Sequence, residues 1–194
     1  MDSGTGEQVE FFFGAMSPYS WLAAERIGEL IPQARWRPVF MGALLHGAGR
    51  QSWGFTDERA AGMADCERRA REYGLGAMRW PQQWPTNDLT AARAMTFAER
   101  AGALERYALA VMRLAFLEGS DMEQRSVVLE AGMRAGLDGG ELERALAAET
   151  IKLALRATTD EALARGVFGA PTVAVGAQLF WGDDRLPEAA AAAS

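Results

Sequence analysis

The sequence has little of the chemistry on which metal and disulfide enzymes depend. Its 194 residues include one cysteine and one histidine. A single cysteine excludes both an internal disulfide and a Cys-x-x-Cys redox pair. One residue of each type leaves few ligands for a transition metal, so we predict no metal site. Cys66 shares a helical face with Met63, Ala70 and Tyr73, which favours a buried and unreactive thiol.

Basic charge and long apolar runs are also scarce. Lys and Arg number 20 against 26 Asp and Glu, so the formal net charge is -6. Nucleic-acid-binding proteins usually carry a basic surface, so we expect no nucleic-acid partner. No apolar run is long enough to cross a bilayer, and Met1–Gly6 has neither the basic nor the apolar region of a secretory signal. We therefore expect no membrane association, a cytoplasmic location and a loose tail at residues 1–6.

The remaining composition, with 49% hydrophobic and 24% charged residues, is typical of a soluble globular chain. Strand-like segments lie near both ends. Two of them, residues 9–13 and 34–40, lie near the N-terminus. The other two, residues 172–175 and 178–181, lie near the C-terminus and are joined by Gly176-Ala177, which suits a tight hairpin turn. In residues 34–40 the alternation of arginine with Trp36 predicts one solvated face, on which Arg35 and Arg37 lie.

Almost no strand signal separates these two regions. Apolar spacing and glycine stops instead predict helices at residues 56–73, 88–101, 104–118, 123–135, 140–149 and 151–165. The sequence therefore predicts an α/β core formed by residues 7–41 and 166–194, with an all-helical insertion at residues 42–165 within one continuous chain.

The stretch from Phe11 to Trp21 organises the first part of that core. Three consecutive phenylalanines predict a strand buried on both faces, and Gly14 allows a turn. Ser17 is a suitable N-cap and Pro18 a suitable first residue for the helix that follows. A helix N-terminus attracts anions, thiolates included, because its N–H groups are unpaired. Ser17 could thus cap the helix only, or also present its hydroxyl to a bound anion.

Several segments, taken in order, resemble the 2-hydroxychromene-2-carboxylate isomerases. With the kappa-class glutathione transferases, these enzymes belong to the DsbA-like branch of the thioredoxin fold. Each motif is weak by itself, but the ordered set covers nearly the whole chain. The matching segments are residues 12–14, 17–23, 36–38, 41–43, 80–81, 84–87, 166–172 and 179–186.

The resemblance implies an α/β, thioredoxin-like fold of the DsbA/kappa type and a site for glutathione. Ser17-Pro18-Tyr19-Ser20 stands where thioredoxin-fold redox enzymes carry Cys-x-x-Cys. In the resembling families the first serine is catalytic, because it hydrogen-bonds the sulfur of glutathione and favours the thiolate. A hydroxyl donor at a helix N-terminus is suited to that task.

Two further segments acquire roles from the same resemblance. Ala170-Pro171 matches the cis-proline loop, whose main chain pairs with the cysteinyl part of glutathione. An ordinary trans proline opening a strand is the alternative. Asp184 matches the aspartate that receives the γ-glutamyl ammonium. Asp183 belongs to the same acidic pair, and could instead cap the last helix.

The sequence also departs from the family pattern. Where relatives often carry a lysine and an asparagine that hold glutathione, this chain has His46 and Arg50. Both could contact glutathione, and both could be ordinary surface residues. Tyr19 and the loop around Trp84 are assigned to the substrate that reacts with glutathione, although a tryptophan in a loop is more often a packing anchor. The loop residues assigned to that substrate are Trp84, Pro85 and Asn87.

We therefore expect a glutathione-dependent isomerase of 2-hydroxychromene-2-carboxylate-type aromatic acids, acting by thiolate addition, ring opening, rotation and elimination. A kappa-like glutathione transferase or peroxidase, or a non-catalytic glutathione- or peptide-binding protein, are the alternatives. A serine hydrolase using Ser17 and His46 fits less well, because the Gly-x-Ser-x-Gly elbow is missing. The resemblance also implies a homodimer.

Overall fold

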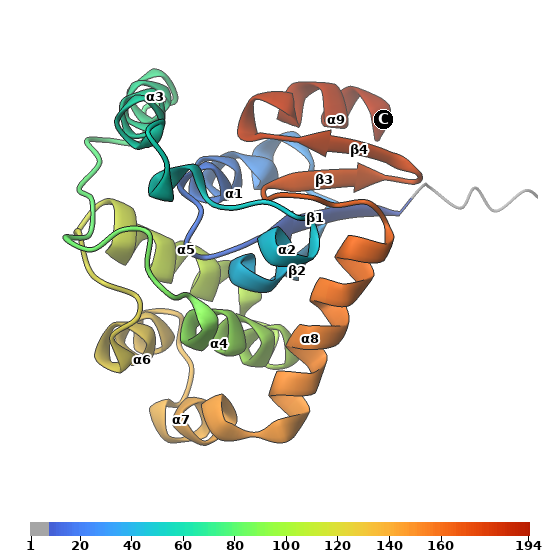
Figure 1. Ribbon diagram of the computed structural model, residues 1–194. Coiled ribbons are helices and arrows are strands. Elements are labelled where there is room, and N and C mark those ends of the chain that lie inside the picture. Colours follow the sequence, from blue (N-terminus) through green and yellow to red (C-terminus); the bar gives the residue numbers. More distant parts are fainter. Residues whose placement is uncertain (1–7) are drawn as a thin grey trace, which may run out of the picture.

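The computed structural model describes residues 8–194, so the tail predicted at residues 1–6 lies outside the described residues. A four-stranded sheet forms the centre of the fold (Figure 1). Its order is β2 (Arg35–Pro38), β1 (Val9–Phe13), β3 (Thr172–Val175) and β4 (Gln178–Trp181). β1 pairs in parallel with β2 and antiparallel with β3, and β3 and β4 form a hairpin. This is the thioredoxin-like sheet that the sequence predicts.

β1 is buried along its whole length because helices cover both faces of the sheet. Phe11, Phe12 and Phe13 are completely inaccessible. Figure 1 shows α9 (Leu186–Ala192) on one side of the sheet and α8 (Glu149–Ala164) on the other. Burying these rings stabilises the fold by roughly 2 kcal/mol each, which holds β1 rigidly in the middle of the sheet.

The long segment between β2 and β3 is helical, and its buried side chains belong to the same hydrophobic core as those of the sheet. Trp21 of α1 (Pro18–Leu30) packs on Phe116, the last residue of α5 (Leu104–Phe116), with ring centroids 5.9 Å apart. No helix within residues 8–194 is both long enough and apolar enough to span a membrane. The other elements of this segment are α2 (Met41–Gly47), the 3-10 turn η1 (Trp53–Phe55), α3 (Arg59–Glu72), α4 (Leu89–Arg100), α5 (Leu104–Phe116), α6 (Arg125–Arg134) and α7 (Gly139–Ala147).

The prediction that Arg37 lies on a solvated strand face is wrong. Arg37 is buried, and its Nη1 donates to Glu10 Oε1 at 3.0 Å. It also pairs with Glu161 of α8, while Arg165 pairs with the other oxygen of Glu10. α8 covers this face of the sheet, so the buried side chains of Arg37 and Glu10 are paired with each other instead of being solvated.

The prediction that an aspartate caps the last helix is also wrong. Residues Asp183–Arg185 form a short 3-10 turn, η2, and α9 begins after Arg185, which makes no side-chain cap. The helix predicted to start at residue 56 begins at Arg59, again without a side-chain cap. The acidic pair therefore lies one turn before α9, where its side chains are free to make other contacts.

Candidate active site

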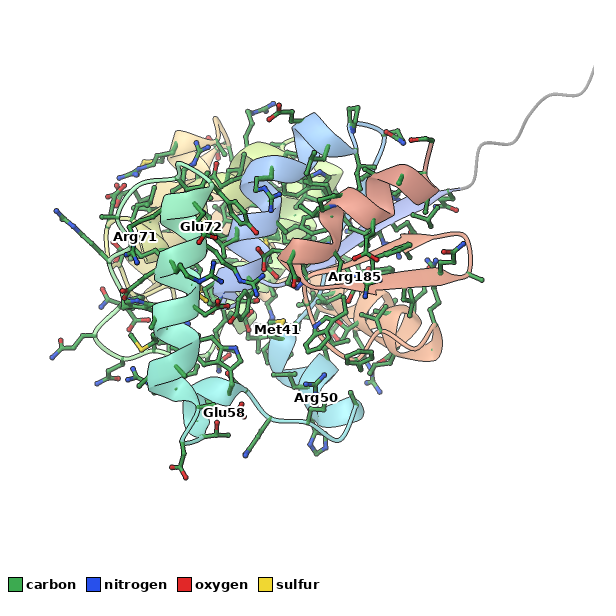
Figure 2. All side chains as sticks on the ribbon, turned by 90° about the horizontal axis from the view of Figure 1, so that it is seen from above. Met41, Arg50, Glu58, Arg71, Glu72 and Arg185 are labelled. Carbon is green, nitrogen blue, oxygen red and sulfur yellow. The ribbon has the colours of Figure 1, made fainter. Side chains whose placement is uncertain are left out.

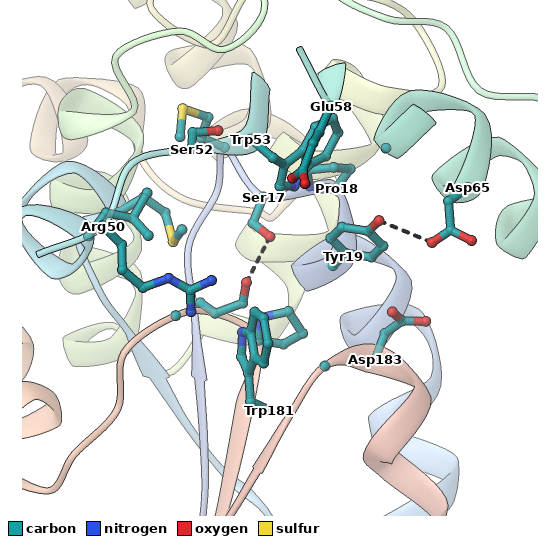
Figure 3. Close-up of a pocket in the computed structure, with 18 of the residues that line it drawn as sticks. Ser17, Pro18, Tyr19, Arg50, Ser52, Trp53, Glu58, Asp65, Trp181 and Asp183 are labelled. Atoms are coloured by element: carbon teal, nitrogen blue, oxygen red, sulfur yellow. Dashed lines mark hydrogen bonds between the residues drawn. The ribbon is translucent and has the colours of Figure 1, made fainter. Parts of the chain in front are cut away.

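A pocket of about 680 Å³ opens at the N-terminus of α1 (Figure 3). This volume is in the range of roughly 300–1,000 Å³ that small-molecule sites occupy. Segments far apart in the sequence line it: the start of α1, Met41 and Leu45 of α2, residues 50–69, Trp84, the Ala170-Pro171 loop and residues 181–185. In Figure 2, α3 lies on one side of the site and the turn carrying Arg185 on the other, with Met41 between them.

Ser17 lies at the bottom of this pocket as the N-cap of α1. Its Oγ accepts a hydrogen bond of 3.1 Å from the N–H of Ser20, as the N-cap prediction requires. Its hydroxyl donates to the carbonyl oxygen of Ala170 at 3.0 Å. Ser17 is thus a cap and also the junction between α1 and the proline loop, so it faces any ligand that bridges the two.

The Ala170-Pro171 peptide bond is cis, as the cis-proline resemblance implies. Within residues 8–194, the N–H of Ala170 makes no hydrogen bond, while its carbonyl receives that of Ser17. An unpaired main-chain donor beside a pocket can receive an extended peptide as an added strand. This loop can therefore hold a short peptide.

The two adjacent aspartates have different environments. The Asp183 side chain is 1% exposed and receives hydrogen bonds from Arg69 Nη1 (2.9 Å) and the Tyr73 hydroxyl (3.0 Å). Burial raises the pKa of Asp183, and Arg69 and Tyr73 partly oppose that rise. Asp184 is 57% exposed and lines the pocket. The Asp183 carboxylate is therefore occupied by contacts within the protein, and the Asp184 carboxylate is the one available to a ligand.

Gly182 makes the exposed position of Asp184 possible. Its φ of 117° lies in a region that side-chain-bearing residues rarely adopt. A Cβ at this position would lie 2.4 Å from Asp184 Oδ1. Only glycine therefore allows the chain to turn here with the Asp184 carboxylate in place.

Arg50 is a cation at the other side of the same opening. Its guanidinium lies over the rings of Trp181 (4.8 Å to the centroid) and Phe168 (5.1 Å). Arg50 forms no ion pair with the residues the structure describes. It is thus free to bind a carboxylate. His46, the other residue predicted as a possible glutathione contact, is exposed on α2 and is not among the residues lining the pocket.

Aromatic rings form the wall opposite the proline loop. Trp53 packs on Trp84 with centroids 4.7 Å apart and on Tyr19 with centroids 6.0 Å apart. All three line the pocket, so two predicted substrate-side residues, Tyr19 and Trp84, are brought together. The other two are not. Pro85 packs under Gly54, and the exposed Asn87 accepts a hydrogen bond from the N–H of Leu89.

Trp84 and Asp88 fix the loop that precedes Ser17. The N–H of Met16 donates to Asp88 Oδ2 at 3.3 Å, and its carbonyl accepts from Trp84 Nε1 at 3.1 Å. Asp88 is completely buried, and this burial raises its pKa to about 7, although the N–H groups of Met16 and Met41 partly oppose the shift. Trp84 is therefore a packing anchor as well as a wall of the pocket.

Cys66 is not a reactive thiol of the pocket. It is buried, and burial raises the pKa of its thiol to about 12. A protonated, inaccessible thiol is a poor nucleophile. No group of His, Cys, Asp or Glu side chains within residues 8–194 has the arrangement of a metal site. The pocket therefore has no cysteine nucleophile and no metal site among the described residues.

A sequence profile of the DSBA-like thioredoxin domain matches residues 8–193. The chain belongs to the DSBA-like thioredoxin domain family. It is 26% identical to the 2-hydroxychromene-2-carboxylate isomerase of Sphingobium xenophagum over 92% of this chain and 93% of that protein. It is 27% identical to human glutathione S-transferase kappa 1, over 92% and 87% of the two chains.

The fold comparison agrees with the sequence comparison. A solved structure of 2-hydroxychromene-2-carboxylate isomerase superposes with a TM-score of 0.80 at 22% identity, covering 92% of this chain and 90% of that one. At that identity the likeness shows the DsbA-like thioredoxin fold alone. In this member of the family serines stand at positions 17 and 20, so dithiol chemistry is excluded.

Sequence reasoning missed several residues that complete the pocket. The wall opposite β4 is lined by α3 and the turn before it. These residues are Asp65 and Arg69 of α3, Glu58 at the N-cap of α3, and Trp53 of η1. The four-residue spacing of Asp65 and Arg69 indicates a pair on one helix face. Nothing in that local pattern indicates that the face meets Asp183, which lies more than a hundred residues further along the chain.

Proposed function

We propose that this protein is a glutathione-dependent isomerase in which Ser17 stabilises the thiolate form of bound glutathione. The observation that supports this most directly is the Ser17 hydroxyl at the N-terminus of α1, 3.0 Å from the Ala170 carbonyl and facing the pocket. A hydroxyl donor and the positive end of a helix both lower the free energy of a sulfur anion.

The other lining groups fit the remaining parts of the tripeptide. Ala170 offers its main chain to the cysteinyl residue, and Asp184 offers an exposed carboxylate to the γ-glutamyl ammonium. Arg50, without an ion-pair partner among the described residues, offers a bidentate donor to the glycine carboxylate. Glutathione, with an ammonium at one end and a glycine carboxylate at the other, is complementary to this set.

Bound glutathione supplies a thiolate that adds to a conjugated double bond, permits rotation and is then eliminated. The chain contributes the geometry and the environment. Ser17 holds the anionic sulfur, and the aromatic wall of Trp53, Trp84 and Tyr19 orients a flat substrate beside it. That wall also excludes water, which strengthens the hydrogen bond from Ser17. Aromatic acids of the 2-hydroxychromene-2-carboxylate type are the proposed substrates, after the names of the relatives.

A kappa-type glutathione transferase is the second candidate, because the human relative of that name matches over nearly the same span. It would use the same thiolate but release a conjugate. The expected homodimer is part of the same proposal, and light scattering of the purified protein checks it.

Titration calorimetry with glutathione, followed by product analysis, tests the proposal. We expect binding below millimolar glutathione, and release of an isomer of 2-hydroxychromene-2-carboxylate with free glutathione recovered. A stable conjugate would indicate the transferase, and binding without turnover a non-catalytic binding protein. Absence of binding at millimolar glutathione would contradict all three.

A further inference from the structure

We propose that Arg69 and Asp184 form a charge pair that recognises both charges at the γ-glutamyl end of glutathione, with Asp184 receiving the α-ammonium and Arg69 the α-carboxylate. This inference rests on the proposed glutathione site and adds a residue from α3 to it. Asp184 alone would accept any primary amine. The pair would select a free α-amino acid.

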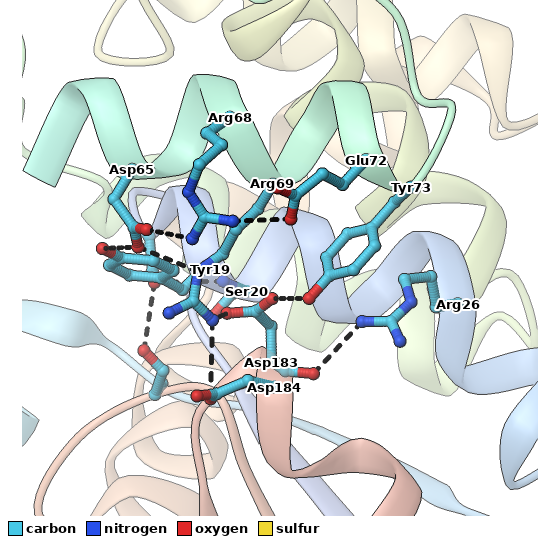
Figure 4. Close-up of polar contacts among 12 residues, drawn as sticks. Tyr19, Ser20, Arg26, Asp65, Arg68, Arg69, Glu72, Tyr73, Asp183 and Asp184 are labelled. Atoms are coloured by element: carbon cyan, nitrogen blue, oxygen red, sulfur yellow. Dashed lines mark hydrogen bonds and ion pairs between the residues drawn. The ribbon is translucent and has the colours of Figure 1, made fainter.

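The position of the Arg69 guanidinium is fixed by the protein. Its Nε donates to Asp65 Oδ2 at 2.8 Å and its Nη1 to Asp183 Oδ1 at 2.9 Å (Figure 4). The same Nη1 lies 3.6 Å from Asp184 Oδ1. Because two nitrogens are held by separate carboxylates, the group is pre-organised, and little side-chain entropy is lost when a ligand binds.

One nitrogen of this guanidinium remains available. Among residues 8–194, Arg69 Nη2 donates no hydrogen bond, although the side chain is 20% exposed and lines the pocket. A guanidinium beside a carboxylate is complementary to an α-amino acid, in which a carboxylate and an ammonium are attached to one carbon. Arg69 and Asp184 offer this pattern at the end of the pocket away from Arg50.

Charge balance also favours a zwitterion at this end. Arg69 already faces three carboxylates, those of Asp65, Asp183 and Asp184. Although burial opposes it, these charges raise the pKa of Arg69 and keep it protonated. An α-amino acid brings one charge of each sign and leaves the sum unchanged. An added carboxylate alone would be repelled by the nearby carboxylates of Asp183 and Asp184.

The other cations that line the pocket have different surroundings. Arg185 donates to Glu188 at 2.7 Å, and Arg50 is stacked on Trp181. Figure 3 shows Arg50 and Asp183 on opposite sides of Trp181. Of these three lining cations, Arg69 is the one paired with Asp184. Arg71, exposed on α3 and outside the pocket lining, is the matched control on the same helix.

Two analogues of glutathione test the two charges of the γ-glutamyl end one at a time, because each analogue lacks one of them. 4-Aminobutanoyl-Cys-Gly lacks the α-carboxylate, and glutaryl-Cys-Gly lacks the α-ammonium. By calorimetry of the wild type, we expect each to bind about tenfold more weakly than glutathione. In Arg69→Lys, we expect glutathione and glutaryl-Cys-Gly to lose about tenfold in affinity and 4-aminobutanoyl-Cys-Gly less than about twofold, because a lysine lacks the fixed fork.

Asp184→Asn should show the opposite pattern, losing affinity for glutathione and 4-aminobutanoyl-Cys-Gly only. Arg71→Gln, at an exposed position of α3 outside the pocket lining, should change none of the three by more than about twofold. Equal weakening of all three ligands in Arg69→Lys would show a general structural role and overturn the inference. If Arg69→Lys does not fold, equal wild-type affinity for glutathione and 4-aminobutanoyl-Cys-Gly would overturn it. Absence of wild-type glutathione binding would instead contradict the proposed function.

Discussion

The hydroxyl of Ser17 donates a 3.0 Å hydrogen bond to the carbonyl oxygen of Ala170, a residue 153 positions later in the chain. This bond joins the N-terminus of α1 to the cis-proline loop. For Ser17 to donate to a bound sulfur, its hydroxyl must turn away from this carbonyl. Under the proposed function, this turn of the hydroxyl frees the Ala170 carbonyl to accept from a main-chain N–H of glutathione, which couples the two contacts.

Replacing Ser17 by alanine should raise the pKa of the glutathione thiol in the complex by roughly one to two units, because a hydrogen bond to a charged group contributes about 1.5–3 kcal/mol. Thiolate absorbance in the ultraviolet, followed against pH, measures this shift. The variant should also lose about 1 kcal/mol of stability with the N-cap. Ser126→Ala, at an exposed position of α6, is the control and should change neither quantity. An unchanged thiol pKa in Ser17→Ala would leave Ser17 a cap only.

Asparagine at positions 183 and 184 should have contrasting effects. Asp183→Asn should lower the free energy of unfolding by about 2 kcal/mol, because it removes the charge from a buried carboxylate that accepts hydrogen bonds from Arg69 and Tyr73. Asp184→Asn should leave stability within about 0.5 kcal/mol of the wild type and weaken glutathione about tenfold. Urea unfolding and calorimetry measure the two quantities. Equal destabilisation by both substitutions would contradict the division of roles.

Replacing Arg50 by glutamine should weaken glutathione binding about tenfold, since a bidentate contact with the glycine carboxylate is lost. The variant should bind γ-glutamylcysteine, which has no glycine, within about twofold of the wild type. Calorimetric titration with both ligands measures this difference. Arg156→Gln, on the exposed face of α8, should bind both ligands normally. If Arg50→Gln weakens both ligands equally, Arg50 stabilises the pocket instead of contacting glycine.

Asp88 should make stability depend on pH. Burial raises its pKa in the folded state to about 7, above the value near 3.9 expected in the unfolded chain. Between these values the folded state binds more protons, so the free energy of unfolding falls as pH rises from about 4 to about 7. Asp88→Asn removes this dependence. Its stability relative to the wild type should therefore increase by on the order of 2 kcal/mol between pH 5 and pH 8.

Urea unfolding of both proteins at the two pH values measures that difference, and all other titrating groups cancel in the comparison. Asp160→Asn, with an exposed carboxylate on α8, is the control and should show no such change. A constant difference between Asp88→Asn and the wild type would mean that the buried carboxylate does not change its protonation state between pH 5 and pH 8, which would contradict this prediction.

Local patterns were sufficient for the elements of the fold because each depends on neighbouring residues. The Phe11–Phe13 run predicts a central strand, and Ser17-Pro18 predicts the start of α1, and both are confirmed. The same reasoning failed for Arg37 and Asp183. Their exposure is decided by α8 and α3, which lie elsewhere in the sequence and cover them in the folded chain.

The sequence by itself determined the order of strands and helices, the missing thiols at positions 17 and 20, and the acidic pair before the last helix. Only the tertiary structure decided which member of that pair is free, that Arg69 reaches it from α3, and that His46, Pro85 and Asn87 lie away from the pocket lining. The physical reason is that hydrophobic periodicity and capping act within a few residues, whereas a binding site depends on which distant side chains remove one another from water.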